Sequence, residues 1–497
     1  MKTLHLAAAL LAVLVVGCAP TAPMATAPTP EGRTFTVLQI NDVYEITPVE
    51  GGQSGGLARV AGLRQQLLAD DPRTITVMAG DFLSPSALGT ARVDGERLYG
   101  RQMVAVLNAL GLDVAAVGNH EFDVSADAFA ARVAEADFPF ITANAVQPSG
   151  ARFDDVPPRL VMTVPTAGGP VRVGIASVVL PSNQKDWVAY LDADSTLRAE
   201  VARLDAETDV VIGLTHQAFA DDVRAAATID GLDLVLGGHE HENVRAYRGA
   251  RMVPILKADA NARTAYVHRV TVGTDGAVSV ASELVSITAA TPEDPAVAAV
   301  VAEWVETAYA GFIADGFDPE AVAVTTTDDL DGREGTVRTR PARLGALIAD
   351  GFVAASGADA GLFNGGSIRV DDVLAAGPFR EYDAIRVLPF GGEVVTVTLP
   401  GAVLARVLSQ GDANAGTGGY LQRSAEIGQA ADGTWTIGGA RLDPARTYTI
   451  ATNDFLVLGL ETGLDFFSVE GNPEITQVGT HGDVRRALLD QLVRVYE

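Results

Sequence analysis

Cysteine is almost absent from this sequence, which holds a single one in 497 residues. A lone cysteine excludes an internal disulfide, so the fold must be stabilised by its apolar core. Basic residues are also scarce, because 36 Lys and Arg stand against 63 Asp and Glu and give a formal net charge of −27. Such a surface repels nucleic-acid backbones and argues against nucleic acid as a partner. The composition leaves the oligomeric state open.

The N-terminal apolar run is too short to cross a bilayer. It spans residues 6–16, well below the roughly 20 residues that a membrane-spanning helix needs. The basic Lys2 before it and Cys18 after it are typical of a bacterial lipoprotein signal. We therefore expect a lipoprotein signal peptide at 1–18, a Pro-, Ala- and Thr-rich tether at 19–32, and an exported periplasmic or cell-surface protein. Lipid on Cys18 would be its only membrane contact, unless the cysteine merely happens to end an ordinary signal peptide.

The length and the periodicity of the rest predict two α/β domains. A chain of 497 residues exceeds one comfortable core. Apolar runs typical of buried strands alternate with amphipathic segments such as 58–70. The predicted strands are 35–40, 74–80, 114–118, 171–179, 209–216 and 233–239. We expect a first domain at 33–290, a connecting helical segment at 291–317 and a second domain at 318–497, with strands at 394–401 and 447–455 and a helix at 343–356.

Polar residues gather directly after the predicted strands of the first domain. They are Asp42, Asp81, Asn119, His120, His216, His239 and His241. The carboxyl ends of strands are where α/β folds build their sites, so these side chains are expected to meet. Oxygen and imidazole ligands without a thiolate suit Zn, Mn, Fe or similar metals. Two such ions side by side would favour hydrolysis of a phosphate ester.

These motifs carry a family resemblance. The series Asp42, Asp81, GNHE (118–121), His216 and GGHEH (238–242) resembles the metallophosphatase domain of the 5′-nucleotidase family, and the second half is similar to that family's C-terminal substrate-binding domain. The resemblance implies a four-layer α/β/β/α domain followed by a smaller α/β domain. It also implies a hydrolase with two divalent metal ions that converts nucleoside 5′-monophosphates to nucleoside and phosphate. A 2′,3′-cyclic nucleotide phosphodiesterase, a nucleotide-sugar hydrolase and a non-catalytic exported binding protein remain alternatives.

The resemblance also implies roles for single residues. Asp81 would bridge the two metals, Asn119, His216 and His239 would complete one position, and Asp42 and His241 would hold the other. His120 and Asp123 match the catalytic pair, while Glu121 is expected to be a packing or supporting residue. In the second domain the resemblance implies a substrate site made of Arg338, Asn364, Arg369, Phe390, Gly418, Gly419, Phe455 and Glu461, in which the two phenylalanine rings enclose the base.

Two positions depart from the family pattern. Tyr44 stands where the family usually has a histidine ligand, and Glu461 stands where it usually has an aspartate. A phenol has a reference pKa of about 10 and must lose its proton to bind a metal well. Three interpretations of Tyr44 stay open: a phenolate that favours a harder ion such as ferric iron at the Asp42 position, a neutral residue beside a water-completed metal, or a weak first metal site. The change at Glu461 leaves the base preference open.

Overall fold

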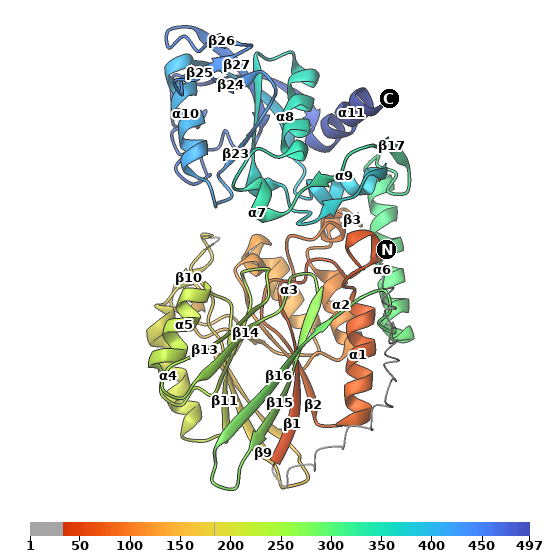
Figure 1. Cartoon of the computed structure of the whole chain (residues 1–497), viewed down its shortest axis with the longest axis vertical. Coiled ribbons are helices and arrows are strands. Elements are labelled where there is room, and N and C mark those ends of the chain that lie inside the picture. Colours follow the sequence, from red (N-terminus) through yellow and green to blue (C-terminus); the bar gives the residue numbers. More distant parts are fainter. Residues whose placement is uncertain (1–32, 183) are drawn as a thin grey trace, which may run out of the picture.

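The computed structural model describes residues 33–182 and 184–497, which form two lobes joined at a narrow waist (Figure 1). The predicted signal peptide, 1–18, and tether, 19–32, lie outside the described residues. The larger lobe contains two six-stranded sheets, and the chain then passes through one long helix into the second lobe.

Both sheets of the first lobe have a parallel centre; the first has antiparallel strands at one edge and the second has them at both edges. In the first sheet the order is β16 (Val278–Ser286), β15 (Thr264–Val272), β1 (Arg33–Ile40), β2 (Thr74–Met78), β5 (Val114–Ala116) and β6 (Phe140–Ile141). In the second it is β13 (Val244–Arg248), β14 (Val253–Lys257), β12 (Leu234–Gly237), β11 (Val210–Thr215), β9 (Val171–Ala176) and β8 (Arg159–Val164). Strands β1, β2, β5 and β6 run parallel, as do β9, β11, β12 and β14.

The sheets face each other across an apolar core. Buried side chains from both sheets form it, among them Phe35, Val77, Val173, Ile212 and Leu236. Helices cover the outer faces: α1 (Leu57–Asp70), α2 (Arg101–Leu110), α3 (Ala126–Glu135), α4 (Ala193–Asp205) and α5 (Phe219–Thr228). Helix α1 contacts β2, whereas α4 and α5 contact β9 and β14. This confirms the predicted four-layer α/β/β/α arrangement.

Short elements complete the first lobe. They are η1 (Glu50–Gly52), η2 (Leu88–Thr90), η3 (His120–Asp123), the pair β3 (Arg92–Val93) and β4 (Glu96–Arg97), and the pair β7 (Ala145–Val146) and β10 (Ala189–Tyr190). The loops that join them lie at the carboxyl ends of the parallel strands, next to the second lobe (Figure 1).

Helix α6 (Pro295–Ala314) joins the lobes along one side of the molecule (Figure 1). Asp294 caps it by accepting hydrogen bonds from the backbone N–H groups of Ala296 and Val297, which is why the helix begins at Pro295. Among the described residues it is the one helix that is long and apolar enough to cross a membrane. It is only partly buried, and its inner face packs on α1 and α2, as expected of a connecting helix.

The second lobe is a smaller α/β domain, as predicted. Its sheet has the order β23 (Leu421–Arg423), β19 (Ala360–Asn364), β27 (Thr447–Asn453), β22 (Glu393–Pro400) and β28 (Thr476–Asp483). The helices are α7 (Glu334–Val337), α8 (Arg343–Ser356), α9 (Glu381–Val387), α10 (Gly401–Ala413) and α11 (Val484–Tyr496). The smaller elements are β17 (Val322–Thr326), β18 (Leu330–Asp331), η4 (Gly365–Ser367), β20 (Val373–Leu374), β21 (Gly377–Arg380), β24 (Ile427–Gln429), β25 (Trp435–Ile437) and β26 (Ala440–Arg441).

Candidate active site

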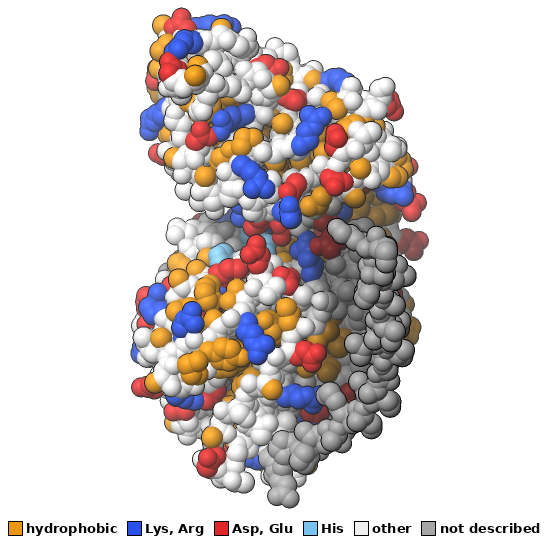
Figure 2. All heavy atoms as spheres, in the orientation of Figure 1, with side chains coloured by type: hydrophobic (Ala, Val, Ile, Leu, Met, Phe, Trp, Pro, Cys, Tyr) orange, Lys and Arg blue, Asp and Glu red, His pale blue; other side chains and the backbone are white. Residues whose placement is uncertain are grey.

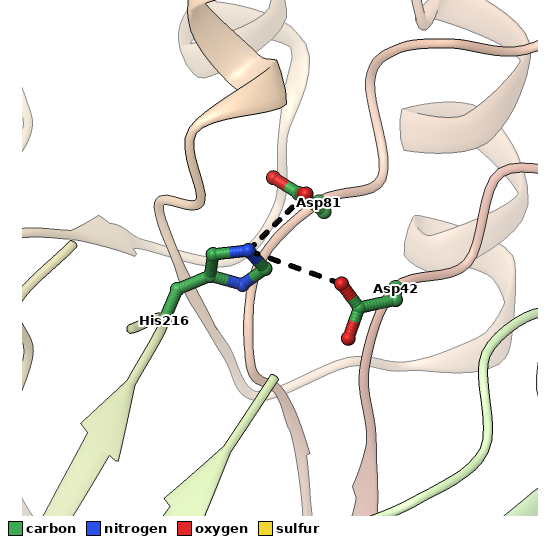
Figure 3. A group of neighbouring side chains, drawn as sticks. All are labelled: Asp42, Asp81 and His216. Carbon is green, nitrogen blue, oxygen red and sulfur yellow. Dashed lines mark ion pairs between the residues drawn. The ribbon is translucent and has the colours of Figure 1, made fainter. Parts of the chain in front are cut away.

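Two carboxylates and one imidazole form a buried cluster where the two sheets of the first lobe meet (Figure 3). Asp42 follows β1, Asp81 follows β2 and His216 follows β11. The His216 Nε2 atom lies 3.1 Å from Asp81 Oδ2 and 3.8 Å from Asp42 Oδ1. All three side chains are buried. Residues that end three different strands therefore meet at one place.

The orientation of His216 suits a metal ligand. Its Nδ1 atom is 2.8 Å from the carbonyl oxygen of Ala79, so Nδ1 carries a proton and donates it. This directs Nε2 at the two carboxylates. Among the described residues no hydrogen-bond partner of suitable geometry satisfies Nε2, although it is fully buried. A buried imidazole nitrogen beside two carboxylates fits a divalent cation.

The backbone around the cluster is strained and tightly packed. Positive φ angles, which residues other than glycine rarely adopt, occur at four positions of the site. They are 52° at Asp42, 58° at Asp81, 91° at His239 and 58° at His241. Such strain persists where surrounding contacts enforce it, and it is typical of functional sites. At Gly238 the packing leaves no room for a side chain, because a Cβ atom there would lie 2.9 Å from Asp42 Oδ2. The GGHEH loop therefore approaches Asp42 only with a glycine at this position.

The remaining predicted metal ligands surround this cluster. The backbone N–H of His239 donates to Asp42 Oδ2 at 2.9 Å, and the His239 ring lies 5.6 Å from that of His216. The Nε2 atom of His241 is 3.7 Å from Asp42 Oδ1. Asn119 is buried at the start of η3, which places it next to the catalytic-pair candidate His120.

Tyr44 lies between two of these candidate ligands. Its hydroxyl donates to Asp81 Oδ2 at 3.2 Å and is 2.9 Å from His241 Nε2. Burial, together with the charges of Asp81 and Asp42, raises the pKa of Tyr44 well above its ordinary value. Without a cation beside it, the phenol therefore stays protonated. The side chain nevertheless occupies the place where a first metal ligand is expected.

His120 and Asp123 form a close pair on η3. The His120 Nδ1 and Asp123 Oδ2 atoms are 2.6 Å apart. On the other side of the ring, Nε2 lies 3.3 Å from the Arg369 guanidinium of the second lobe. A guanidinium can only donate, so in this arrangement Nε2 accepts and Nδ1 carries the proton that faces Asp123. The backbone N–H of His120 also donates to Asp81 Oδ1 at 2.8 Å, which ties the pair to the cluster.

The charges of the cluster shift the protonation of its members in opposite directions. Burial lowers the pKa of His216, but the neighbouring carboxylates of Asp81 and Asp42 outweigh it and raise this pKa to about 10. For His239, burial and the charge of His216 lower the pKa to about 3. Burial alone would raise the pKa of Asp81, yet His216 and His120 bring it far below its usual range. The two carboxylates thus attract positive charge to the point where they meet, and a metal ion would compete there with a proton on His216.

Glu121, which the sequence indicated only as a packing or supporting residue, anchors the loop that carries Asp81. Its buried carboxylate accepts four backbone N–H groups, those of Gly118, Asp81, Phe82 and Leu83, at 2.6, 2.9, 2.7 and 3.0 Å. Burial and the charge of Asp81 raise the pKa of Glu121 to about 7. One side chain thereby fixes the loops that follow β2 and β5.

Lys257 anchors the two loops that carry His216 and the GGHEH motif. Its buried ammonium pairs with Asp222 at 2.8 Å and with Glu240, and it donates to the carbonyl oxygens of Gln217 and Gly238 at 2.7 and 2.8 Å. Glu240 lies between the two candidate ligands of the GGHEH motif. The sequence offered one signal, because Lys257 ends a strand that is otherwise apolar.

A cleft of about 1080 Å³ lies between the lobes, and the candidate ligand His241 lines it together with Glu334 and Arg338 of the second lobe. Charged side chains of both signs and a histidine are visible at the waist (Figure 2). Among the predicted substrate residues, Arg338 and Arg369 meet around Glu334. Arg369 Nη1 is 3.4 Å from Glu334 Oε1, and Arg338 forms an ion pair with the same carboxylate. Of the two arginines, Arg369 thus reaches the candidate catalytic histidine His120.

The other predicted substrate residues form a second group within the lobe. Asn364 Nδ2 donates to Glu461 Oε2 at 2.9 Å, and a Cβ on Gly419 would lie 3.1 Å from Glu461 Oε1. The backbone oxygen of Gly418 accepts from Gly366. Phe390 and Phe455 are 41% and 37% exposed on neighbouring turns, and no ring contact joins them among the described residues. Exposed aromatic rings of this kind are available for stacking on a base.

Comparison with known proteins agrees with this arrangement. Residues 35–243 match the model of the calcineurin-like phosphoesterases, and residues 321–468 match that of the 5′-nucleotidase C-terminal domain. The 5′-nucleotidase of Bos taurus is 26% identical over 439 residues, which cover 78% of this chain and 74% of the bovine protein. The crystal structure of a 5′-nucleotidase precursor from Thermus thermophilus superposes with a TM-score of 0.75 at 24% identity, covering 93% of this chain and 97% of that one. A sulfate thiohydrolase, SoxB, shares the fold with a TM-score of 0.69 at 16% identity, over 95% of this chain and 96% of that one.

The fold and the buried cluster define a metal-dependent phosphoesterase, an enzyme that hydrolyses phosphoric esters with divalent metal ions. A calcineurin-like phosphoesterase domain followed by a 5′-nucleotidase C-terminal domain identifies the family more specifically than the first domain alone does. The chain belongs to the 5′-nucleotidase family.

Proposed function

We propose that this enzyme hydrolyses nucleoside 5′-monophosphates at a two-metal site in the first lobe, with the second lobe holding the substrate. One observation carries the proposal: Arg369 reaches across the cleft to His120, which is paired with Asp123 and tied to the Asp81 carboxylate. An anion-binding arginine, an oriented imidazole and a carboxylate cluster converge at one place. This is the set of groups that transfer of a phosphoryl group to water requires.

The residues divide the work by position. Asp42, Asp81, Asn119, His216, His239 and His241 would hold two divalent ions. When bound, the ions would supply Lewis-acid polarisation of the phosphoryl group and an activated water. Arg369 and Arg338 would hold the phosphate by charge-assisted hydrogen bonds. The ring of His120, oriented by Asp123, would stabilise the charge that develops on the reacting phosphoryl group. Phe390 and Phe455 would stack on the base with little discrimination among bases.

The proposal is tested with purified, metal-analysed protein and a panel of esters. We expect turnover of AMP with added Zn²⁺ or Mn²⁺ and loss of turnover after chelation. UDP-glucose, 2′,3′-cyclic nucleotides and bis(p-nitrophenyl) phosphate test the other esters that the same site would accept. Turnover of these compounds without turnover of AMP would overturn the substrate assignment. A complete lack of turnover with every metal would favour the non-catalytic binding protein.

Tyr44 gives a separate prediction about the first metal position. Because its hydroxyl lies between Asp81 and His241 without the low pKa of a good ligand, we expect the Asp42 position to bind metal more weakly than the His216 position. Tyr44→His would supply a neutral nitrogen and tighten that position at least about tenfold, measured by chelator competition. Tyr44→Phe serves as the matched control, since it removes only the hydroxyl. Binding of ferric iron with a visible phenolate band that disappears in Tyr44→Phe would instead establish the phenolate interpretation.

A further inference from the structure

His241 differs from His216 in where its second ring nitrogen finds a partner. His216 Nδ1 donates to Ala79, which belongs to the same lobe. His241 Nδ1 instead lies 3.3 Å from Asp371 Oδ2 and 3.7 Å from Glu334 Oε2, and both carboxylates belong to the second lobe. A metal-binding histidine usually donates its outer N–H to such a partner, which fixes the tautomer and the direction of the ring. For His241 that partner comes from across the cleft.

The backbone at Asp371 is held in the orientation that this contact needs. Asp371 has a φ of 40°, which costs free energy for a residue with a side chain. Its Oδ1 atom accepts from the backbone N–H of Glu334 at 3.0 Å, so Oδ2 is left to face His241. Its carbonyl oxygen accepts from Arg263 of the first lobe at 2.5 Å. The first lobe therefore contacts Asp371 twice, once at the side chain and once at the backbone.

The contact is sheltered enough to matter energetically. The side chains of His241 and Asp371 are 12% and 15% exposed, so water screens their attraction less than it would on an open surface. Glu334 is the weaker partner, because Arg338 and Arg369 already engage its carboxylate. Of the two acidic residues, Asp371 alone both lies within hydrogen-bond distance of Nδ1 and has a second anchor in the first lobe.

We propose that Asp371 is a positioning residue for His241, so that the second lobe completes the metal position that Asp42 and His241 form. With Asp371 in place, the ring of His241 is held so that Nδ1 faces Asp371 while Nε2 faces Asp42 and the Tyr44 hydroxyl. Separation of the lobes removes this partner and frees the ring to rotate. By linkage, a metal ion at this position then favours contact between the lobes, and contact between the lobes tightens the metal. The inference rests on the proposed function, because it takes His241 as a ligand.

The test measures metal binding by the full-length protein rather than turnover. Mn²⁺ is titrated into metal-free wild type, Asp371→Ala, His241→Ala and the double variant. Loss of an outer partner typically weakens metal binding 10- to 100-fold, so Asp371→Ala should weaken one of the two ions by about that factor and leave the other unchanged. Asp371→Asn keeps an oxygen acceptor without the charge and should lose less. In the His241→Ala background, Asp371→Ala should change nothing further.

Asp412→Ala is the matched control, because this carboxylate pairs with Arg423 within the second lobe. It should bind both ions as wild type does. Unchanged binding in Asp371→Ala, or an equal loss whether or not His241 is present, would overturn the inference. Should Asp371→Ala fail to fold, the Asn variant decides alone: wild-type affinity would count against the inference and an intermediate affinity for it. If wild type binds fewer than two ions or does not hydrolyse esters, the proposed function fails instead.

Discussion

Replacement of His120 by alanine is expected to lower turnover by about 10²- to 10³-fold while both metal ions stay bound. The ring is the part that faces the second lobe, where its Nε2 atom lies beside Arg369. The part that supports the cluster is the backbone N–H, which donates to Asp81 Oδ1 and survives the substitution. Turnover of AMP and metal content by elemental analysis separate the two effects. The KM should change little, because the ring acts on charge that develops only in the transition state.

His239→Ala is expected to act on metal binding first, in contrast to His120→Ala, which acts on turnover alone. Its ring lies 5.6 Å from that of His216 beside the carboxylate cluster, so its removal should release the metal first and abolish turnover as a consequence. His481→Ala is the control, because this histidine lies on β28 of the second lobe, 3.1 Å from Thr396. If His120→Ala lost as much metal as His239→Ala, or if both kept it, the division between charge-stabilising and ligand roles would be wrong.

The fold could be predicted from the sequence because apolar periodicity reports burial directly. The runs at 35–40 and 74–80 became β1 and β2, and the polar residues that end them, Asp42 and Asp81, meet as expected. Parallel strands bring their carboxyl ends to one edge of the sheet. Polar residues that follow such strands are therefore predicted to lie close together in the fold. The same logic placed His216 in the cluster from a strand of the other sheet.

The contacts of the supporting residues could not be predicted, because their partners are distant or belong to the backbone. Asp371 contacts His241 across 130 positions and between two lobes, and no local spacing encodes such a contact. Glu121 is adjacent to His120 in the sequence, yet its four partners are N–H groups, which no residue type reveals. Tyr44 was visible as a departure, but only the structure shows that its hydroxyl touches both Asp81 and His241.

Glu121→Ala is expected to lower the free energy of unfolding of the metal-free enzyme by about 3–5 kcal/mol. The substitution leaves four buried N–H groups without their acceptor, and each such group costs roughly 1–3 kcal/mol unless water reaches it. Two of the four belong to Asp81 and its neighbour Phe82, where the chain at Asp81 holds a φ of 58°. The loop should relax from this strained form, so metal affinity should fall together with stability. Denaturant unfolding and metal titration measure the two losses.

The matched control distinguishes the backbone anchor from an ordinary buried carboxylate. Glu200 is also buried in the first lobe, but its partners at 2.7 Å are Arg159 and Arg203. Their side chains are 32% and 60% exposed and stay hydrated when the carboxylate is removed. Glu200→Gln should therefore cost about 1 kcal/mol or less. Glu121→Gln should remain severe, because its amide turns two N–H donors toward groups that are themselves donors. Equal losses in the two Gln variants, or normal metal affinity in Glu121→Gln, would mean that Glu121 does not hold the Asp81 loop.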